Sequence, residues 1–114
     1  MKPTVNILVV DDEVNIRGAL VTMLEKKGHQ VRGVATAEEG LEYLETTPAE
    51  LVITDLRMPG IGGIEFLRRL KDTWPDTEVV VMTAYGSIDT AVEAMRCGAY
   101  DYLAKPIDRE RFPI

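Results

Sequence analysis

Residues 6–12 read Asn-Ile-Leu-Val-Val-Asp-Asp, a run of four apolar residues that ends in two adjacent carboxylates. A short run that is apolar at consecutive positions is typical of a parallel strand buried on both faces. Residues 51–55, Leu-Val-Ile-Thr-Asp, follow a similar pattern and also end in a carboxylate. The two stretches predict inner strands of a parallel sheet, each followed by acidic side chains.

Segments with helical periodicity separate these and three further strand-like runs. The expected strands are Asn6–Val10, Gln30–Val34, Leu51–Thr54, Glu78–Met82 and Asp101–Ala104, and the expected helices run over Val14–Lys27, from Ala37 through Leu44, from Ile64 to Trp74 and over Ser87–Cys97. Gln30–Val34 alternates polar and apolar residues, which favours an edge strand. Strict alternation of strand and helix with short connections predicts an α/β fold, a doubly wound five-stranded parallel sheet with helices on both faces.

The composition limits the classes of function. A chain of 114 residues forms one domain of ordinary size, residues 1–114. The net charge is −6 and the basic residues are scattered, which argues against direct binding to nucleic acid. No apolar run could span a bilayer and no secretory signal is visible, so we expect no membrane association. A single cysteine, Cys97, cannot form an internal disulfide, and we expect a cytoplasmic protein.

The last residues are too few for a complete fifth covering helix. Residues 107–114 follow the fifth expected strand and contain Phe112-Pro113. We expect a truncated fifth helix, which leaves two alternatives. Either one face of the sheet is partly bare, or the chain is the N-terminal part of a longer regulator.

Polar residues follow four of the five expected strands. In open parallel α/β sheets, ligands bind beyond the carboxyl ends of the strands. Asp11, Asp12, Asp55, Thr83 and Lys105 all fall there. Taken singly, each has an ordinary structural explanation, since an acid can cap a helix, Asp55 can start a turn, Thr83 can end a strand and Lys105 can be an exposed loop residue. Their placement on one rim of the sheet favours a shared site.

The charges of this rim indicate what it could bind. Three carboxylates outnumber one ammonium, so a divalent cation would balance the site. Oxygen ligands suit Mg²⁺, whereas a zinc site is not supported, because His29 and Cys97 stand alone and far apart. A site with Mg²⁺, a lysine, a hydroxyl and a carboxylate could hold a phosphoryl group, and aspartate is a known phosphoryl nucleophile.

Together these residues resemble the receiver domain of bacterial two-component response regulators. The matching motifs are Val9-Val10-Asp11-Asp12-Glu13, Asp55-Leu56-Arg57-Met58-Pro59-Gly60, Met82-Thr83-Ala84-Tyr85 and Lys105-Pro106. The match extends over residues 5–107 and implies a flavodoxin-like strand order, 2-1-3-4-5. Residues 83–87 and 98–102 are similar to the nitrogen-regulation class, whose members activate sigma-54 RNA polymerase.

The resemblance implies a role for each acidic residue. Asp55 would be the phosphoacceptor, and Asp12 and Asp55 would ligate Mg²⁺ directly. Asp11 would act mainly through water, and the backbone carbonyl of Arg57 would complete the protein ligands. Gly62 departs from the pattern, because many relatives carry an acidic residue there.

The resemblance also implies a switch and partners. Thr83 would hydrogen-bond the phosphoryl group, Lys105 would pair with it, and Tyr102 would be the aromatic switch residue. The Lys105–Pro106 peptide is expected to be cis. The implied partners are a sensor histidine kinase and, in the full-length chain, an ATPase and a DNA-binding output domain, with a homodimer left open.

Two other functions compete with this interpretation. One is a Mg²⁺-dependent phosphohydrolase with an aspartyl-phosphate intermediate, which would need a substrate pocket and a general acid. The residues after Asp55 are Leu56-Arg57, which supply no second acid. The other is a passive docking module with a vestigial rim, against which the complete set of Asp12, Asp55, Thr83 and Lys105 argues.

Overall fold

The computed structural model describes residues 5–57, 60–83 and 88–104 of the chain. In these residues five parallel strands form one sheet in the order β2-β1-β3-β4-β5. The strands are β1 Asn6–Val10, β2 Gln30–Val34, β3 Leu51–Asp55, β4 Glu78–Thr83 and β5 Asp101–Ala104, and the helices are α1 Val14–Lys26, α2 Ala37–Thr46, α3 Gly62–Thr73 and α4 Ile88–Arg96. The predicted fold class and the flavodoxin-like strand order are confirmed.

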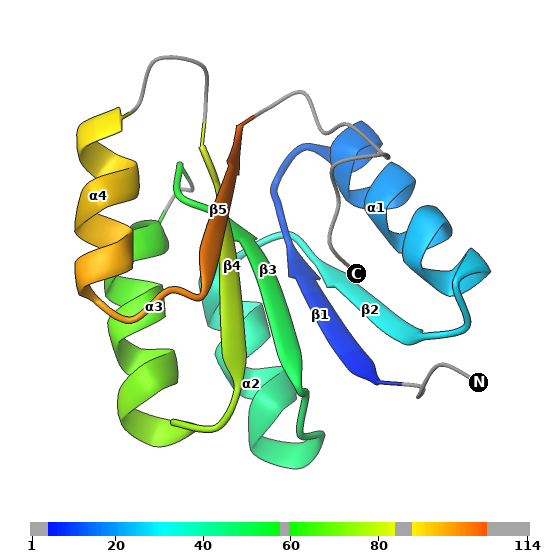
Figure 1. Ribbon diagram of the computed structural model, residues 1–114. Helices are drawn as coiled ribbons and strands as arrows, with labels where there is room; N and C mark the ends of the chain where they lie inside the picture. Colours follow the sequence, from blue (N-terminus) through cyan, green and yellow to red (C-terminus); the bar gives the residue numbers. More distant parts are fainter. Residues whose placement is uncertain (1–4, 58–59, 84–87, 105–114) are drawn as a thin grey trace.

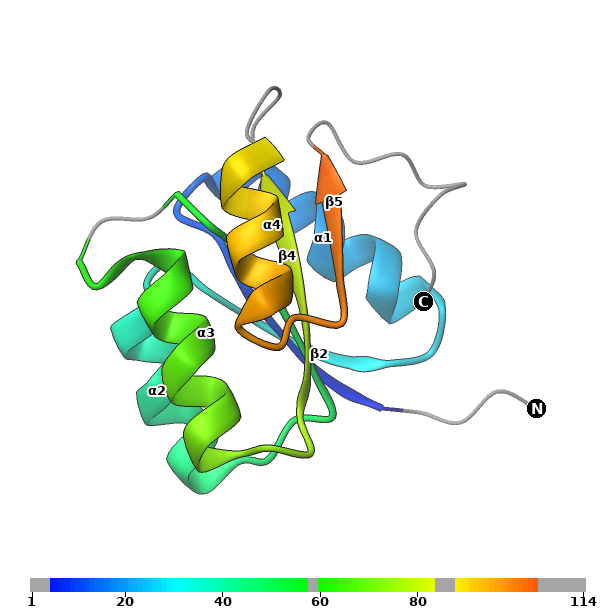
Figure 2. The same cartoon turned by 60° about the vertical axis from the view of Figure 1, so that its left-hand side comes forward.

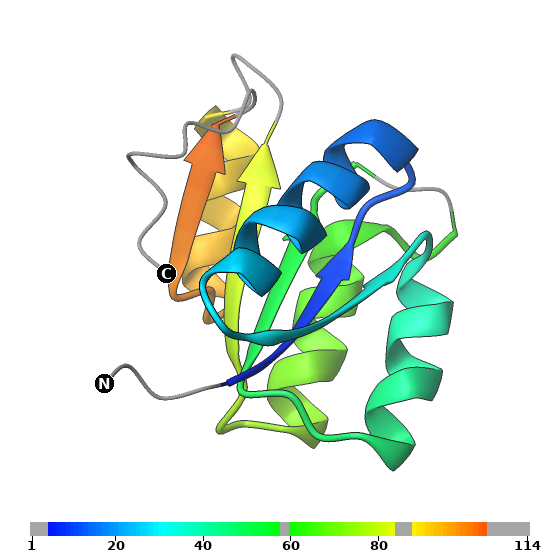
Figure 3. The ribbon, with the colours of Figure 1, turned by 90° about the vertical axis from the view of Figure 1, so that its right-hand side faces the viewer.

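Helices cover both faces of the sheet (Figure 1). Of the described helices, α1 alone lies on one face (Figure 3), and α2, α3 and α4 lie on the other (Figure 2). Strand β1 shows why its sequence is apolar throughout. Ile7 and Val9 belong to the apolar cluster under α1, and Leu8 and Val10 belong to the cluster under the other helices. Burial on two faces therefore removes the usual alternation of polar and apolar residues.

The element boundaries differ from the sequence expectations by one or two residues. Strand β3 extends to Asp55 and β4 extends to Thr83, because the ladder continues from Asp55 to Met82 and from Thr83 to Ala104. Helix α3 begins at Gly62, two residues before the expected start at Ile64. Ser87, the first residue of the expected fourth helix, lies outside the described residues. The extended strands carry two of the predicted site residues as their last members.

Two helix ends carry residues whose chemistry suits the end of a helix. The hydroxyl oxygen of Thr36 accepts a hydrogen bond from the backbone amide of Glu39 at 3.1 Å, as an N-cap residue should. Gly28 follows α1 with φ of +95°, the left-handed conformation that favours glycine after a helix. Among the described residues, no helix has the length and hydropathy needed to cross a bilayer.

Candidate functional site

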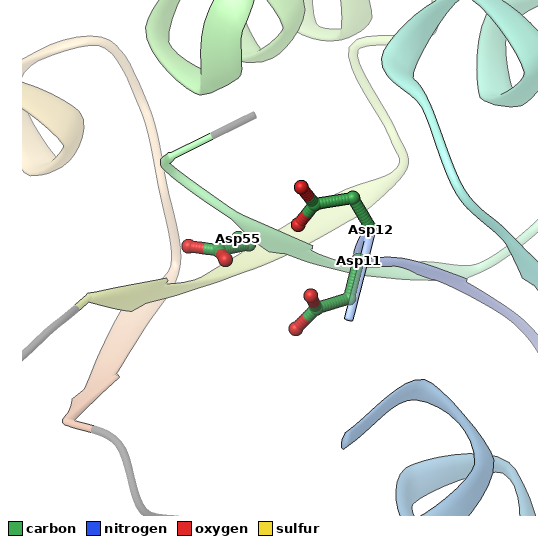
Figure 4. Close-up of side chains that lie close together, drawn as sticks. All are labelled: Asp11, Asp12 and Asp55. Carbon is green, nitrogen blue, oxygen red and sulfur yellow. The ribbon is translucent and has the colours of Figure 1, made fainter. Parts of the chain in front are cut away.

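Three carboxylates lie together at the carboxyl ends of β1 and β3. Asp11, Asp12 and Asp55 each offer a carboxylate oxygen, and these three oxygens all lie within 4.8 Å of one another. Figure 4 shows the carboxylates of Asp11 and Asp12 directed toward the side on which Asp55 lies. The exposed fractions of Asp11 and Asp55 are 0% and 5%, whereas Asp12 is exposed to solvent. Two of the three acids, Asp11 and Asp55, are thus buried, and the third, Asp12, faces solvent.

The strand register explains this convergence. Val10 pairs with Thr54 in the parallel ladder of β1 and β3. The next residue on each strand is an aspartate, Asp11 on one chain segment and Asp55 on the other, so the two acids are neighbours across the sheet. Both strands are inner strands with a hydrogen-bonded neighbour on each side. The acids are therefore fixed by the rigid centre of the fold rather than by a loop.

Backbone hydrogen bonds hold Asp11 in place. Its amide donates to the carbonyl oxygen of Val34 at 3.1 Å, which extends the contact with β2 by one residue. Its carboxylate atom Oδ1 accepts the backbone amide of Glu13 at 2.9 Å. An aspartate that accepts an amide two residues on forms a local turn, and here that turn leads from β1 into α1. The turn sets the direction in which the Asp11 carboxylate points.

Asp55 is held in the same manner at the end of β3. Its Oδ1 accepts the backbone amide of Arg57 at 3.0 Å. The hydroxyl of Thr54 donates to the backbone carbonyl of Asp55 at 3.1 Å, and the amide of Leu56 donates to the carbonyl of Met82 at 3.0 Å. The last bond continues the ladder to β4 beyond the side chain of Asp55. The carboxylate is consequently oriented before any ligand binds.

Thr83 ends β4, the strand next to Asp55. The ladder pairs Asp55 with Met82, so Thr83 stands one residue further along the neighbouring strand. Its exposed fraction is 5%, which places this hydroxyl-bearing residue at the buried end of the sheet. The predicted switch residue Tyr102 lies on β5 and pairs with Val81, and 47% of it is exposed. The structure thus brings Thr83 beside the acidic cluster and leaves Tyr102 on the surface.

Three further predicted features are less fully described. Arg57 follows Leu56 and is exposed. Its backbone amide donates to the Asp55 carboxylate, whereas the predicted ligand is its carbonyl oxygen. Lys105 and Pro106 lie outside the described residues, and so does the predicted cis peptide between them. The roles assigned to these residues stay predictions.

The cluster fits a small divalent cation. Three carboxylates this close repel one another, and a bound cation relieves that repulsion. All donor atoms are oxygens, the ligand type that Mg²⁺ prefers, and Mg²⁺ commonly uses one or two carboxylates together with water and phosphate oxygens. The exposure of Asp12 leaves the cluster open to solvent on one side. The donor chemistry and the spacing therefore agree with the predicted metal.

Comparison with known proteins decides the family. The model of the response regulator receiver domain matches residues 7–113. This chain belongs to the receiver domain family. As a receiver domain it is similar to the response regulator protein PilR of Pseudomonas aeruginosa, with 38% identity over 91% of this chain and 23% of that protein. It is also similar to the transcriptional regulator NtrC of Proteus hauseri, with 36% identity over 90% of this chain and 22% of that protein.

A solved structure supports the same assignment. The crystal structure of NtrX from Brucella abortus in complex with ADP superposes with a TM-score of 0.92 and 36% identity, over 96% of this chain and 25% of NtrX. PilR and NtrC belong to the sigma-54 activator class, as the sequence predicts. The receiver domain spans about a quarter of the length of the curated relatives it matches.

Sequence reasoning overlooked one residue that shapes this receiver site. A Cβ added to Gly63 would lie 2.4 Å from the Cα of Leu56 and 2.8 Å from the carbonyl oxygen of Asp55. Only a residue without a side chain lets α3 approach the end of β3 this closely. The Gly62-Gly63 pair was a visible signal, but as part of a Pro- and Gly-rich stretch it indicated only a loop.

Proposed function

We propose that this receiver domain is a phosphorylation-dependent switch that accepts a phosphoryl group on Asp55 from the phosphohistidine of a sensor histidine kinase. The observation that supports this most directly is the convergence of Asp11, Asp12 and Asp55 at the ends of two inner strands. Asp55 is the member that belongs to β3 itself, is nearly buried and has its carboxylate fixed by the amide of Arg57. A fixed, oriented carboxylate is well suited to attack phosphorus in line.

The transfer needs no reactant other than the kinase phosphohistidine and water. A carboxylate oxygen of Asp55 forms the new O–P bond while the P–N bond to the kinase imidazole breaks. The imidazole leaves with the bonding electron pair and takes up a proton from water. The product is an acyl phosphate on Asp55, which water can later hydrolyse to restore the carboxylate and release phosphate.

The proposed metal ligands are Asp12 and Asp55, with Asp11 acting through water and the Arg57 carbonyl as the last protein donor. When bound, Mg²⁺ supplies positive charge that offsets the negative charge on the phosphoryl oxygens. The chain's own contribution is geometric, because the local turns at Asp11 and Asp55 orient the donors in advance. Lys105 is proposed to pair with another phosphoryl oxygen.

The signal is proposed to leave through α4 and β5. A phosphoryl group adds roughly one negative charge to Asp55 and carries three acceptor oxygens. The hydroxyl of Thr83 can donate a hydrogen bond to one of these oxygens. Tyr102 on β5 is then free to turn inward as the space beside Thr83 changes. Four large apolar or aromatic residues are exposed on α4, on β5 and between the two elements: Val92, Met95, Tyr100 and Tyr102. A shift of Thr83 would therefore alter an exposed apolar surface that an output partner could read.

The proposed output is control of transcription. The support is that the curated relatives, named as response regulators and transcriptional regulators, are about four times as long as the matched region. We infer that ATPase and DNA-binding domains in the full-length regulator receive the signal, and that the exchange with the kinase takes place in the cytoplasm.

Incubation with a small-molecule phosphodonor tests this function. With Mg²⁺ present, intact-protein mass spectrometry should show one phosphoryl adduct on the wild-type chain and none on Asp55→Asn. Asp76→Asn is a matched control, because Asp76 is an exposed carboxylate in the α3–β4 turn. Rapid multiple turnover on phosphoesters, without a lasting adduct, would favour the phosphohydrolase instead. An adduct that forms equally on Asp55→Asn would overturn the proposal.

A further inference from the structure

Arg17 occupies a position that local helix chemistry does not favour. It lies in the first turns of α1, where the helix dipole favours acidic rather than basic side chains. The first turn of α1 contains no acidic residue, and Glu13 at the N-cap makes no side-chain cap within the described residues. A residue that contradicts a local preference often serves a site. The contacts of Arg17 show which site that is.

The guanidinium of Arg17 reaches back to the end of β1. Its Nη1 donates a hydrogen bond to the backbone carbonyl oxygen of Asp11 at 2.8 Å. The backbone amide of Asp11 donates to the carbonyl oxygen of Val34 on β2. Both backbone polar groups of Asp11 are thus bonded, one by the sheet and one by Arg17. The carbonyl in question belongs to the peptide that joins Asp11 to Asp12, two members of the acidic cluster.

Gly33 on β2 makes room for the stem of Arg17. A Cβ at Gly33 would lie 3.0 Å from Cγ and 3.3 Å from Cδ of Arg17, and 3.2 Å from Cγ2 of Val21. The backbone of Gly33 has no positive φ, so its conformation does not require glycine. Glycine inside a strand weakens the strand unless something approaches closely. Here the approaching groups are Val21 and, nearest of all, the side chain of Arg17 that holds the Asp11 carbonyl.

We propose that Arg17, seated over Gly33, is a positioning residue for the metal site. By holding the Asp11–Asp12 peptide, it sets the directions in which the two carboxylates leave the chain and so maintains their approach to Asp55. Arg17 acts on the cluster through the backbone, by its hydrogen bond to the carbonyl oxygen of Asp11. This inference rests on the proposed function, because it concerns Mg²⁺ binding by the same cluster. Partners one shell outside a metal site commonly control ligand orientation in this way.

Substitution of Arg17 by lysine separates position from charge. Removing the positive charge would by itself favour cation binding, whereas Arg17→Lys keeps that charge but replaces the planar fork with a shorter point donor. We expect Arg17→Lys to raise the Kd for Mg²⁺ about tenfold, measured by isothermal titration calorimetry. In the metal-free protein, the amide ¹⁵N shift of Asp12 should also move, because it follows the carbonyl that Arg17 holds.

Gly33→Ala tests the seat of Arg17 without changing Arg17 itself. We expect it to weaken Mg²⁺ binding in the wild-type background and to have no effect in the Arg17→Ala background, where the stem is missing. Gly18→Ala is the matched control, because a Cβ at Gly18 meets nothing within 4 Å, and it should bind Mg²⁺ as the wild type does. If Gly33 served only the stability of the fold, Gly33→Ala would lower stability, and its effect on Mg²⁺ binding would not depend on Arg17.

The outcomes separate the two proposals. A wild-type protein that binds no Mg²⁺ overturns the proposed function, and this inference with it. Wild-type binding with an unchanged Kd and an unchanged Asp12 amide shift in Arg17→Lys overturns the inference alone. An equal loss of Mg²⁺ affinity on Gly33→Ala in the wild-type and Arg17→Ala backgrounds also overturns the inference.

Discussion

Gly63 and Leu56 approach so closely that a Cβ at Gly63 would lie 2.4 Å from the Cα of Leu56. The amide of Gly63 also donates to the carbonyl oxygen of Leu56 at 3.2 Å. Helix α3 is thereby packed directly against the backbone that follows Asp55. The position of the proposed phosphoacceptor depends on a contact that only glycine permits.

Replacing Gly63 by alanine should therefore destabilise the domain. The added methyl group meets backbone atoms, which cannot move aside as a flexible side chain can, and overpacking of this kind costs roughly 1–3 kcal/mol. Gly18→Ala should have the opposite sign and stabilise by about 0.5–1 kcal/mol, because Gly18 lies in the exposed interior of α1. Urea unfolding of the two variants measures this contrast. A Gly63→Ala protein as stable as the wild type would contradict the packing described here.

Mg²⁺ should stabilise the folded domain through the acidic cluster. A ligand at ten times its Kd that binds only the folded state adds about 1.4 kcal/mol, or roughly 5 °C in Tm for a domain of this size. In Asp12→Ala this response should vanish, and the metal-free Tm should rise, because one of three repelling charges is gone. Thermal unfolding with and without Mg²⁺ measures both effects.

Glu45→Ala provides the control for that experiment. Glu45 is an exposed acid on α2, outside the cluster, so its loss removes the same charge without touching the proposed site. Its Mg²⁺ response should equal that of the wild type. If Asp12→Ala responds as strongly as Glu45→Ala, the metal assignment is wrong.

Thr83 should couple the phosphoryl group to the surface of α4 and β5. Thr83→Ala removes the hydroxyl while leaving Asp55 and the metal ligands in place, so phosphorylation should persist while the surface response is lost. The measurement compares amide chemical shifts of residues 88–102 with and without a phosphoryl mimic. A response as large in Thr83→Ala as in the wild type would contradict the coupling.

The sequence predicted the sheet because burial on two faces leaves a direct mark on a strand. The apolar runs of β1 and β3 and the alternating β2 indicated inner and edge strands, and the order β2-β1-β3-β4-β5 agrees. The acidic cluster was predictable for a related reason. Parallel strands end at one rim, so Asp11 and Asp55 had to lie near each other once their strands were adjacent.

The finer contacts were not predictable, because they depend on how helices cross the sheet. The hydrogen bond from Arg17 to the Asp11 carbonyl requires that α1 lie over β2 at Gly33. No local sequence pattern encodes this packing of helix on strand. The start of α3 differs from the expected Ile64 for a similar reason. Gly62, with φ of +79°, begins the helix although glycine usually marks a loop, and the packing of Gly63 on Leu56 compensates for the weak local preference.

Among the three neighbouring carboxylates, Asp55 is the one that we propose carries the phosphoryl group. Borohydride converts an aspartyl phosphate to homoserine, and peptide mass spectrometry then identifies the position of the converted residue. After treatment with a phosphodonor and Mg²⁺, we expect homoserine at position 55 and unchanged aspartate at Asp11 and Asp12. Homoserine at either of those positions, or an unconverted Asp55 in a phosphorylated chain, would contradict it.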